Sequence, residues 1–418
     1  MNSNNSAREV IPSASRLIKS LRDMGYDFSA AIADLVDNSI EARATKVAID
    51  VEFAGGDSQV RITDNGRGMT SGKLIEAMRY GSKRKYRQDD LGRFGLGLKT
   101  ASLSQCQRLS VATRTDRLNP TISAFCWDLR HVERTDKWEV LSLKPSKQTR
   151  SIFDPLKGST GTVVLWQRLD RILDYKVPDG DASRKRLLTM CRELEQHLAM
   201  VFHRFLSGEV LRRKFELTLN GNPVQAWDPF ARSEPGTVRL HSVTIPVEYG
   251  GAFFDVKLEP FILPHQDAFS SPEAFRLASG PANWNQQQGF YIYRGNRLIQ
   301  SGGWSRLRTS DEHSKLARIA LSFPPSLDGA FRINVAKMRV QLPPQIKEQI
   351  EEAIKPALKL AQETYRKGIK APKPTSATQR WSLEELQVQL ENIAEPAEKL
   401  LIRELFTRLR NERQITGD

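Results

Sequence analysis

The 418-residue sequence has few cysteines and no long apolar run. Only Cys106, Cys126 and Cys191 are present, without paired spacing, which argues against a disulfide framework or a zinc module. The six histidines are scattered and form no metal-ligand pattern. No apolar run is long enough to cross a bilayer, and the polar start MNSNNSAREV lacks the apolar region of a signal peptide. We therefore expect a cytoplasmic protein with no membrane partner.

The chain is strongly basic, with a formal net charge of +14. Basic residues cluster at 83–87, 184–186 and 212–214, and such clusters attract the phosphates of nucleic acids. Each cluster alone also fits a solvated face. Because no segment resembles a base-reading helix, we expect contact with the DNA backbone without sequence specificity.

The segment DLVDNSIEA is the first of three short motifs. Apolar residues recur at helical spacing from 30 to 44, so Asp34 and Asn38 fall one turn apart on one helix face. The carboxylate would polarise a water toward a phosphorus, and the amide oxygen would help to hold a magnesium ion. Taken alone, the motif fits a polar stripe on a surface helix equally well.

The second motif, DNGRGM, follows the alternating run 59–63, which predicts a strand. Asp64 would stand at the end of this strand, where its carboxylate accepts a hydrogen bond from an adenine amino group. Gly66 and Gly68 would let the backbone approach the base, and Met69 offers it a polarisable wall. A plain glycine turn between a strand and a helix is the alternative interpretation.

The third motif, GRFGLGLKTAS, places glycines ahead of an apolar run that resembles the start of a helix. Backbone amides of residues 94–98 would then form a nest over phosphate oxygens. The motif is neither a P-loop nor a dinucleotide fingerprint, since no GKT or GKS closes it. We assign nucleotide binding to Gly92, Phe94, Gly95, Leu96, Gly97, Leu98, Lys99 and Thr100. The charged segment before it, YGSKRKYRQDD, fits a lid.

The order of the three motifs resembles the GHKL ATPases, the superfamily of gyrase, heat-shock chaperones, histidine kinases and MutL. The resemblance implies bound ATP and Mg²⁺, with Asp34 as the general base, Asn38 as the magnesium ligand and Asp64 as the adenine reader. The glycines of the third motif would belong to the lid, and Thr162 in STGTVVLW would lie beside the adenine. The base in this family is usually glutamate. An aspartate is shorter, so we expect slow turnover.

Two later segments indicate the branch of the superfamily. GFYIYRGNRLIQSGGW predicts two strands around an Arg-Gly-Asn turn, and GAFRINVAKMRVQLP predicts a strand that delivers Lys337. Both resemble the second domain of MutL, and the first also resembles MORC ATPases. The resemblance implies that Lys337 reaches back to the terminal phosphate; a surface lysine at a strand end is the alternative.

We predict an α+β fold with a GHKL-type ATP-binding α/β sandwich, a MutL- or gyrase-like transducer domain and a C-terminal helical extension. The predicted boundaries are 1–175 for the ATP-binding domain with an N-terminal dimerisation segment and 176–343 for the second domain, opening with a helical run at 184–206. A helix at 344–370, a linker at 371–380 and an amphipathic helical tail at 381–418 would follow.

The predicted function is a Mg²⁺-dependent ATPase that acts as a nucleotide-gated dimeric clamp in a DNA-associated system, such as restriction or anti-phage (antiviral) defence. Protein partners would supply nuclease or helicase activity, because the chain carries no such motif. A histidine kinase is disfavoured because no histidine precedes His131. A heat-shock-type chaperone and an ATP-binding scaffold with negligible hydrolysis stay open as alternatives.

Overall fold

The computed structural model describes residues 10–23, 25–81, 97–115, 121–210, 214–333, 340–370, 387, 390, 399 and 402–406. The chain divides into two compact units, residues 1–366 and 367–418. In the second unit the described residues are helical, and the predicted linker and most of the predicted tail lie outside the described residues. The first unit contains two mixed sheets with helices packed on them, which confirms the α+β class.

The first sheet has eight strands in the order β5-β4-β3-β6-β2-β1-β7-β8. Its strands are β1 (Lys46–Glu52), β2 (Gln59–Asp64), β3 (Arg108–Arg114), β4 (Ser123–Asp128), β5 (Leu141–Ser142), β6 (Gly161–Gln167), β7 (Glu216–Leu219) and β8 (Asn222–Pro223). The accompanying helices are α1 (Ala14–Arg22), α2 (Phe28–Glu41), α3 (Ser71–Met78), α4 (Gly97–Leu103), α5 (Leu129–Thr135), α6 (Arg150–Phe153), α7 (Asp181–Val201) and α8 (His203–Leu206). Helix α2 and strand β2 lie where the apolar spacing predicts a helix and a strand.

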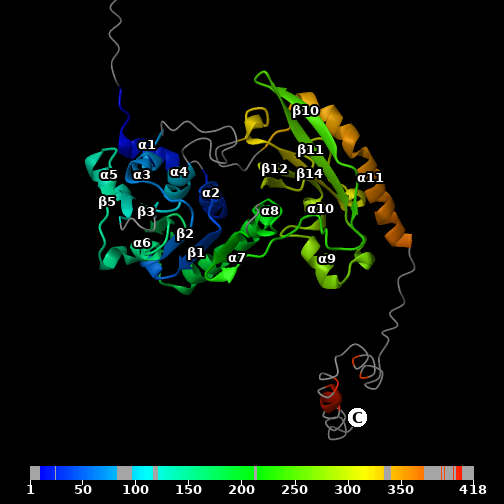
Figure 1. Ribbon diagram of the computed structural model, residues 1–418, viewed down its shortest axis with the longest axis horizontal. Helices are drawn as coiled ribbons and strands as arrows, with labels where there is room; N and C mark the ends of the chain where they lie inside the picture. Colours follow the sequence, from blue (N-terminus) through cyan, green and yellow to red (C-terminus); the bar gives the residue numbers. More distant parts are fainter. Residues whose placement is uncertain are drawn as a thin grey trace, which may run out of the picture. The chain divides into compact units, whose positions relative to one another are not determined.

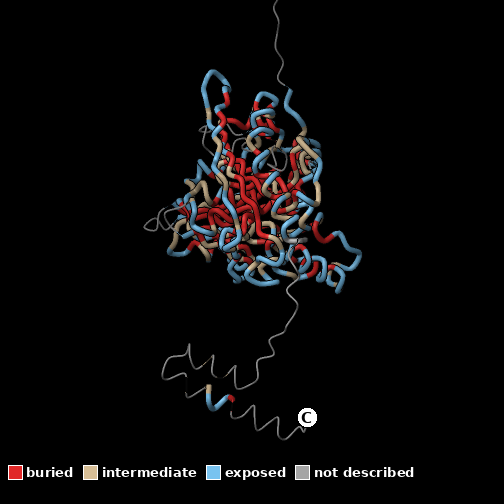
Figure 2. Tube along the Cα trace, turned by 90° about the vertical axis from the view of Figure 1, so that its right-hand side faces the viewer, coloured by how far each residue is buried: buried red, intermediate tan, exposed pale blue. Residues whose placement is uncertain are grey.

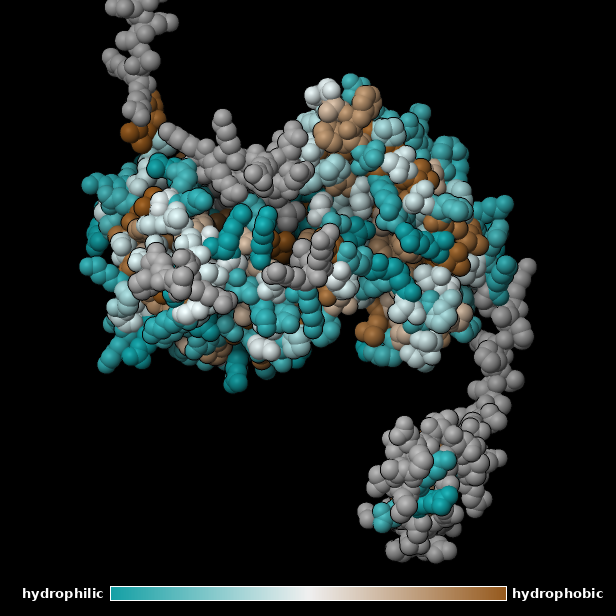
Figure 3. Space-filling model, in the orientation of Figure 1, coloured by the Kyte–Doolittle hydropathy of each residue, from teal (hydrophilic) through white to brown (hydrophobic). Residues whose placement is uncertain are grey.

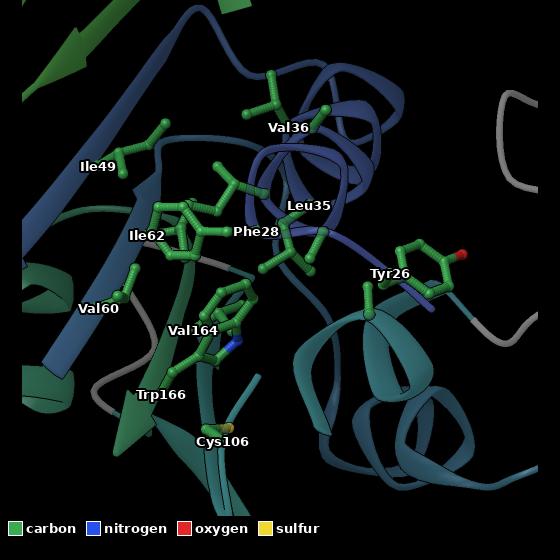
Figure 4. Packing of buried hydrophobic residues seen from close by; sticks show 14 of the residues in the cluster. Tyr26, Phe28, Leu35, Val36, Ile49, Val60, Ile62, Cys106, Val164 and Trp166 are labelled. Atoms are coloured by element: carbon green, nitrogen blue, oxygen red, sulfur yellow. The ribbon is translucent and has the colours of Figure 1, made fainter. Parts of the chain in front are cut away.

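Helix α2 is buried against one face of this sheet. It starts where the Asp27 side chain accepts a hydrogen bond from the backbone N–H of Ala30. Figure 4 shows Phe28 and Leu35 of the helix close to the sheet residues Ile62 and Trp166. The rings of Phe28 and Trp166 meet edge to face, with centroids 6.3 Å apart. This packing holds α2, and therefore the first motif, rigidly against the strands.

The opposite face of the sheet carries a smaller apolar cluster. Because side chains alternate along a strand, Val164 and Trp166 of β6 face α2, whereas Val163 and Leu165 face away from it. The second pair packs on Phe153 and the turn that follows α6. The first sheet is therefore covered on both faces over its central strands.

Helix α7 and strand β7 follow the predicted domain boundary at residues 175 and 176, and both make contacts with the first sheet and its helices. Four apolar side chains of α7 lie in the same core as α2: Leu187, Met190, Leu194 and Leu198. Strand β7 pairs in parallel with β1. The boundary itself stays a prediction, since residues 1–366 form one compact unit. The helix buries its apolar stripe against α2, a choice of partner that its own sequence does not specify.

The second sheet contains β9 (Val238–Arg239), β10 (Val243–Tyr249), β11 (Ala252–Ile262), β12 (Gly289–Arg294), β13 (Arg297–Ser301) and β14 (Ala317–Phe323). Its main path runs β10-β11-β14-β12-β13, and β9 pairs with β11. The short helices α9 (Pro272–Ala278) and α10 (Trp284–Gln287) lie between β11 and β12 in the chain. The predicted pair of strands around the Arg-Gly-Asn turn corresponds to β12 and β13, which pair antiparallel.

The long helix α11 (Lys347–Lys370) follows a 3-10 turn at Pro344–Ile346 and lies along the second sheet in Figure 1. It buries Ile350, Ile354, Ala357 and Ala361 in the core of that sheet, as the helical pattern predicts. The predicted strand ahead of Lys337 is not a strand in its described part. Phe331 and Arg332 lie in a turn, and Arg332 has a positive φ of 49°.

Helices α7 and α8 lie between the two sheets (Figure 1), and α7 contacts β13. The His203 Nε2 atom lies 2.8 Å from the hydroxyl of Tyr293, and the Arg204 guanidinium stacks 3.5 Å from the centre of the same ring. Burial lowers the pKa of His203 to about 4, so this histidine is neutral at physiological pH. The two sheets are thus joined by a packed and hydrogen-bonded junction.

Burial follows this layered arrangement. In Figure 2 the buried parts of the trace gather in the interior, and exposed segments lie on the outside. In Figure 3 the visible face is mostly hydrophilic with scattered apolar groups. Among the described residues, no helix combines the length and the apolar character that crossing a bilayer requires.

Candidate nucleotide site

Asp34 lies on the buried face of α2 with 3% of its surface exposed. Its Oδ2 accepts a hydrogen bond of 3.0 Å from the hydroxyl of Tyr26. Burial and the neighbouring Asp34 raise the pKa of Tyr26, so the phenol stays protonated and continues to donate. Gly97, the first residue of α4, lies so close that an added Cβ would be 3.5 Å from the same carboxylate oxygen. The first and third motifs therefore meet at Asp34.

A second carboxylate, Asp37, lies one turn further along α2 and is also buried. Its Oδ2 is 2.7 Å from Nε of Arg297, which stands at the start of β13 in the second sheet. The contact is ionic, because the Nε–H group is not aligned with the oxygen for a hydrogen bond. Nη2 of Arg297 lies 3.8 Å from Oδ1 of Asp34. An arginine from the second sheet thus reaches both buried carboxylates of α2.

Asn38, the predicted magnesium ligand, is exposed on α2, immediately after Asp37. Its side chain forms no hydrogen bond with the described residues, so its amide oxygen is available to a ligand. Within the described ranges, no cluster of three metal-ligating His, Cys, Asp or Glu side chains occurs. A magnesium ion held here by Asn38 would need most of its ligands from phosphate and water.

Asp64 is the last residue of β2 and is buried. Its Oδ1 accepts from the backbone N–H of Gly66 at 2.8 Å, and its Oδ2 accepts from the Ser39 hydroxyl at 3.3 Å. Burial is the main cause that raises its pKa from 3.8 to about 6, and these hydrogen bonds oppose the rise. The carboxylate is therefore ionised, and an acceptor only, above about pH 6.

Both glycines of the second motif are required by the protein's own packing. At Gly68, which has a φ of +62°, an added Cβ would lie 2.1 Å from the carbonyl oxygen of Arg114. At Gly66, an added Cβ would lie 2.9 Å from Ala42 and from the Asp64 carboxylate. The turn after β2 thus packs tightly onto its neighbours, which positions the carboxylate of Asp64.

Thr162 of β6 lies directly opposite Asp64 in the strand register. Its hydroxyl is 3.2 Å from that of Thr113 on β3, which accepts a hydrogen bond of 2.9 Å from the backbone N–H of Met69. Three neighbouring strands and the turn after β2 therefore bring Asp64, Thr162 and Met69 together. These three residues are the ones assigned to adenine from the sequence.

The third motif is described from Gly97 onward, at the start of α4. Leu98 packs on the first core, and the hydroxyl of buried Thr100 has no hydrogen-bond partner in the described part of the chain. The buried Lys99 donates to the carbonyl oxygen of Ala77 at 2.9 Å, and burial lowers its pKa to about 8. Gly92, Phe94, Gly95 and Leu96 lie outside the described residues.

Lys337 also lies outside the described residues, but the base of its loop is described. The backbone N–H of Gln341 donates to the carbonyl oxygen of Phe331 at 2.9 Å. This bond holds the two ends of residues 331–341 together.

Sequence reasoning missed Tyr26, Asp37 and Arg297. Asp37 stands inside the quoted DLVDN motif, and its spacing of three residues from Asp34 was a usable signal. Tyr26 and Arg297 carry no local signal, because their proximity to Asp34 arises from packing between distant segments.

Residues 26–162 match the family model described as histidine kinase-, DNA gyrase B-, and HSP90-like ATPase. This span is thus similar to GHKL-type ATPase domains, and the three motifs described above lie within it.

Part of the chain is also similar in sequence to MutL proteins. The chain is 29% identical over 206 residues to the DNA mismatch repair protein MutL of Haemophilus influenzae (strain PittEE), which covers 48% of this chain and 28% of the relative. It is 30% identical over 202 residues to MutL of Herminiimonas arsenicoxydans, a match that covers 48% of this chain and 29% of that relative. MutL of Shewanella frigidimarina is 36% identical over 102 residues, covering 23% and 16%. The match therefore spans less than a third of these relatives' length.

Proposed function

We propose that this protein binds and hydrolyses ATP with Mg²⁺, and that Asp34 is the general base. The observation that carries the proposal is the convergence on one region of Asp34, the start of α4 and the cluster around Asp64. Helix α2 links the two ends of this region, because it carries Asp34, Asn38 and Ser39. One rigid helix and the strand beside it thus hold the proposed general base, the proposed metal ligand and the carboxylate proposed to recognise adenine.

The described residues fit a nucleotide and its metal ion. Asp64 has spare acceptor capacity for an adenine amino group, and Thr162 lies beside it. Asn38 presents an uncommitted amide oxygen on the same helix as the base. Bound Mg²⁺ would neutralise charge on the phosphates.

Asp34 would act on the attacking water. An ionised carboxylate accepts the proton of a water molecule and orients it toward the terminal phosphorus. The hydroxyl of Tyr26 donates a hydrogen bond to one oxygen of the Asp34 carboxylate and so fixes the orientation of that side chain. Because aspartate is shorter than glutamate, we propose that turnover is slow.

We further propose that ATP gates a dimeric clamp on DNA. The support is the similarity to relatives named DNA mismatch repair proteins and the excess of positive charge. Of the basic clusters, residues 184–186 are described and lie exposed near the start of α7. Lys337 would join the terminal phosphate and couple nucleotide state to the second sheet. Partner nucleases or helicases would supply any chemistry on DNA, in a restriction or anti-phage system.

The test of the ATPase is phosphate release by the purified protein and by Asp34→Ala. We expect the wild type to release phosphate in the presence of Mg²⁺, and the variant to be at least 50-fold slower, within the range of losses for a general base. Binding of a fluorescent ATP analogue by both proteins is the control for an intact site. Equal release by the two proteins at background level would contradict the proposal.

A further inference from the structure

Helix α2, which carries the proposed general base, has two buried carboxylates. Asp34 and Asp37 lie one turn apart and both are nearly inaccessible to solvent. Two carboxylates at this spacing on one helix face repel each other. A second carboxylate beside a general base is therefore unfavourable unless it holds something in place.

Asp37 holds Arg297. The guanidinium is 4% exposed, lies 2.7 Å from Asp37 through Nε, and extends Nη2 to 3.8 Å from Asp34. It also lies 6.0 Å from the centre of the Phe202 ring, at the junction with α7. An ionic contact on one side and a ring on the other fix its position.

The guanidinium comes from the second sheet. Arg297 is the first residue of β13 and follows the turn at Gly295 and Asn296. On the other side of the junction, Arg204 of α8 donates to Asn296 and to Ser322 of β14. The turn that carries Arg297 is therefore held to α8 through Asn296 and to α2 through Arg297.

We infer that Arg297 is a positioning residue for Asp34, through which docking of the second sheet prepares the general base. Asp37 anchors the guanidinium, and the guanidinium supplies a fixed positive charge that attracts and orients the Asp34 carboxylate. This inference rests on the proposed function, since it assigns Arg297 a role in ATP hydrolysis. It differs from the role expected for Lys337, because Arg297 acts on the base and not on the phosphate.

The test separates nucleotide binding from turnover. In Arg297→Gln we expect kcat for ATP hydrolysis to fall at least ten-fold while the Kd of a fluorescent ATP analogue changes less than three-fold. In Arg297→Lys, which restores a positive charge without the planar fork, we expect part of the lost kcat to return.

Arg318→Gln is the matched control. It removes a buried arginine of β14 that donates to the backbone carbonyl oxygens of Pro229 and Ala278, away from the turn that carries Arg297. We expect this variant to melt at a lower temperature and to keep kcat within two-fold, measured per folded molecule. If Arg297→Gln loses activity only to the extent that Arg318→Gln does, Arg297 has a purely structural role.

A double variant covers the case in which Arg297→Gln fails to fold. Arg297→Gln with Asp37→Asn removes the stranded buried charge together with its partner. A folded double variant with reduced kcat supports the inference, and one with wild-type kcat overturns it. If the wild type releases phosphate no faster than Asp34→Ala, the proposed ATPase function is wrong. If only the Arg297 variants keep wild-type kcat, the role of Arg297 alone is wrong, so the two failures are distinguishable.

Discussion

At the residue scale, burial of the Asp64 carboxylate has a cost in stability. Its pKa in the folded protein is raised from 3.8 to about 6, chiefly by burial. The folded state therefore binds more protons than the unfolded state between these two values. Because of this difference, Asp64 lowers the free energy of unfolding as pH rises through that window, and the loss persists above pH 6.

The comparison of wild type with Asp64→Asn tests this linkage. We expect the difference in unfolding free energy to move in favour of the variant by about 2–3 kcal/mol between pH 4 and pH 7. ATP affinity should change in the opposite sense: that of the wild type rises from pH 5 to pH 7, because an ionised acceptor is needed. Denaturant titrations and nucleotide-analogue titrations at several pH values measure both effects.

Asp136 provides a control of opposite sign. It is an exposed aspartate whose pKa is lowered by hydrogen bonds from the Ser15 backbone N–H and the Ser13 hydroxyl. Asp136→Asn should therefore lose stability relative to wild type as pH rises through the acid range. Parallel pH profiles for the two variants would contradict the assignment of the Asp64 shift to burial.

At the scale of elements, the turn between β2 and α3 depends on one glycine conformation. Gly68 has a positive φ, and a side chain there would overlap the carbonyl oxygen of Arg114. We expect Gly68→Ala to lower the free energy of unfolding by about 2–4 kcal/mol and to weaken ATP-analogue binding, since the turn positions Asp64 and Met69. Thermal melts and binding titrations check this.

Gly72→Ala is the matched control for that variant. Gly72 lies in α3 with open space around it, so alanine should stabilise the helix by about 0.5–1 kcal/mol. A Gly68→Ala protein as stable as Gly72→Ala would show that the turn tolerates a side chain and that its backbone geometry does not position the site.

At the scale of the whole molecule, the proposed clamp predicts that nucleotide changes the oligomeric state. We expect sedimentation velocity to show a shift from monomer toward dimer on addition of Mg²⁺ and a non-hydrolysable ATP analogue. ADP should leave the protein mainly monomeric. The physical reason is that the terminal phosphate would bridge the lid and the second sheet and so order the N-terminal segment. A protein that stays monomeric with the analogue contradicts the clamp.

Sequence alone predicted the elements whose signals are local. Helix α2 follows from apolar spacing, and β2 follows from alternation, so the positions of Asp34, Asn38 and Asp64 on their elements were predictable. The strand pair β12 and β13 was predictable from two apolar runs around a turn. The packing of α7 after the predicted domain boundary was not predictable, because the side chains that receive its apolar stripe come from distant segments of the chain.

By itself, the sequence determined on which elements the candidate site residues stand, because motif order and periodicity are properties of short segments. Only the tertiary structure decided that Arg297, which is separated from Asp34 by more than half of the chain, reaches both buried carboxylates of α2. It also decided that Tyr26 donates to Asp34 and that Thr162 stands opposite Asp64. Packing between distant segments sets these distances, and no local pattern encodes them.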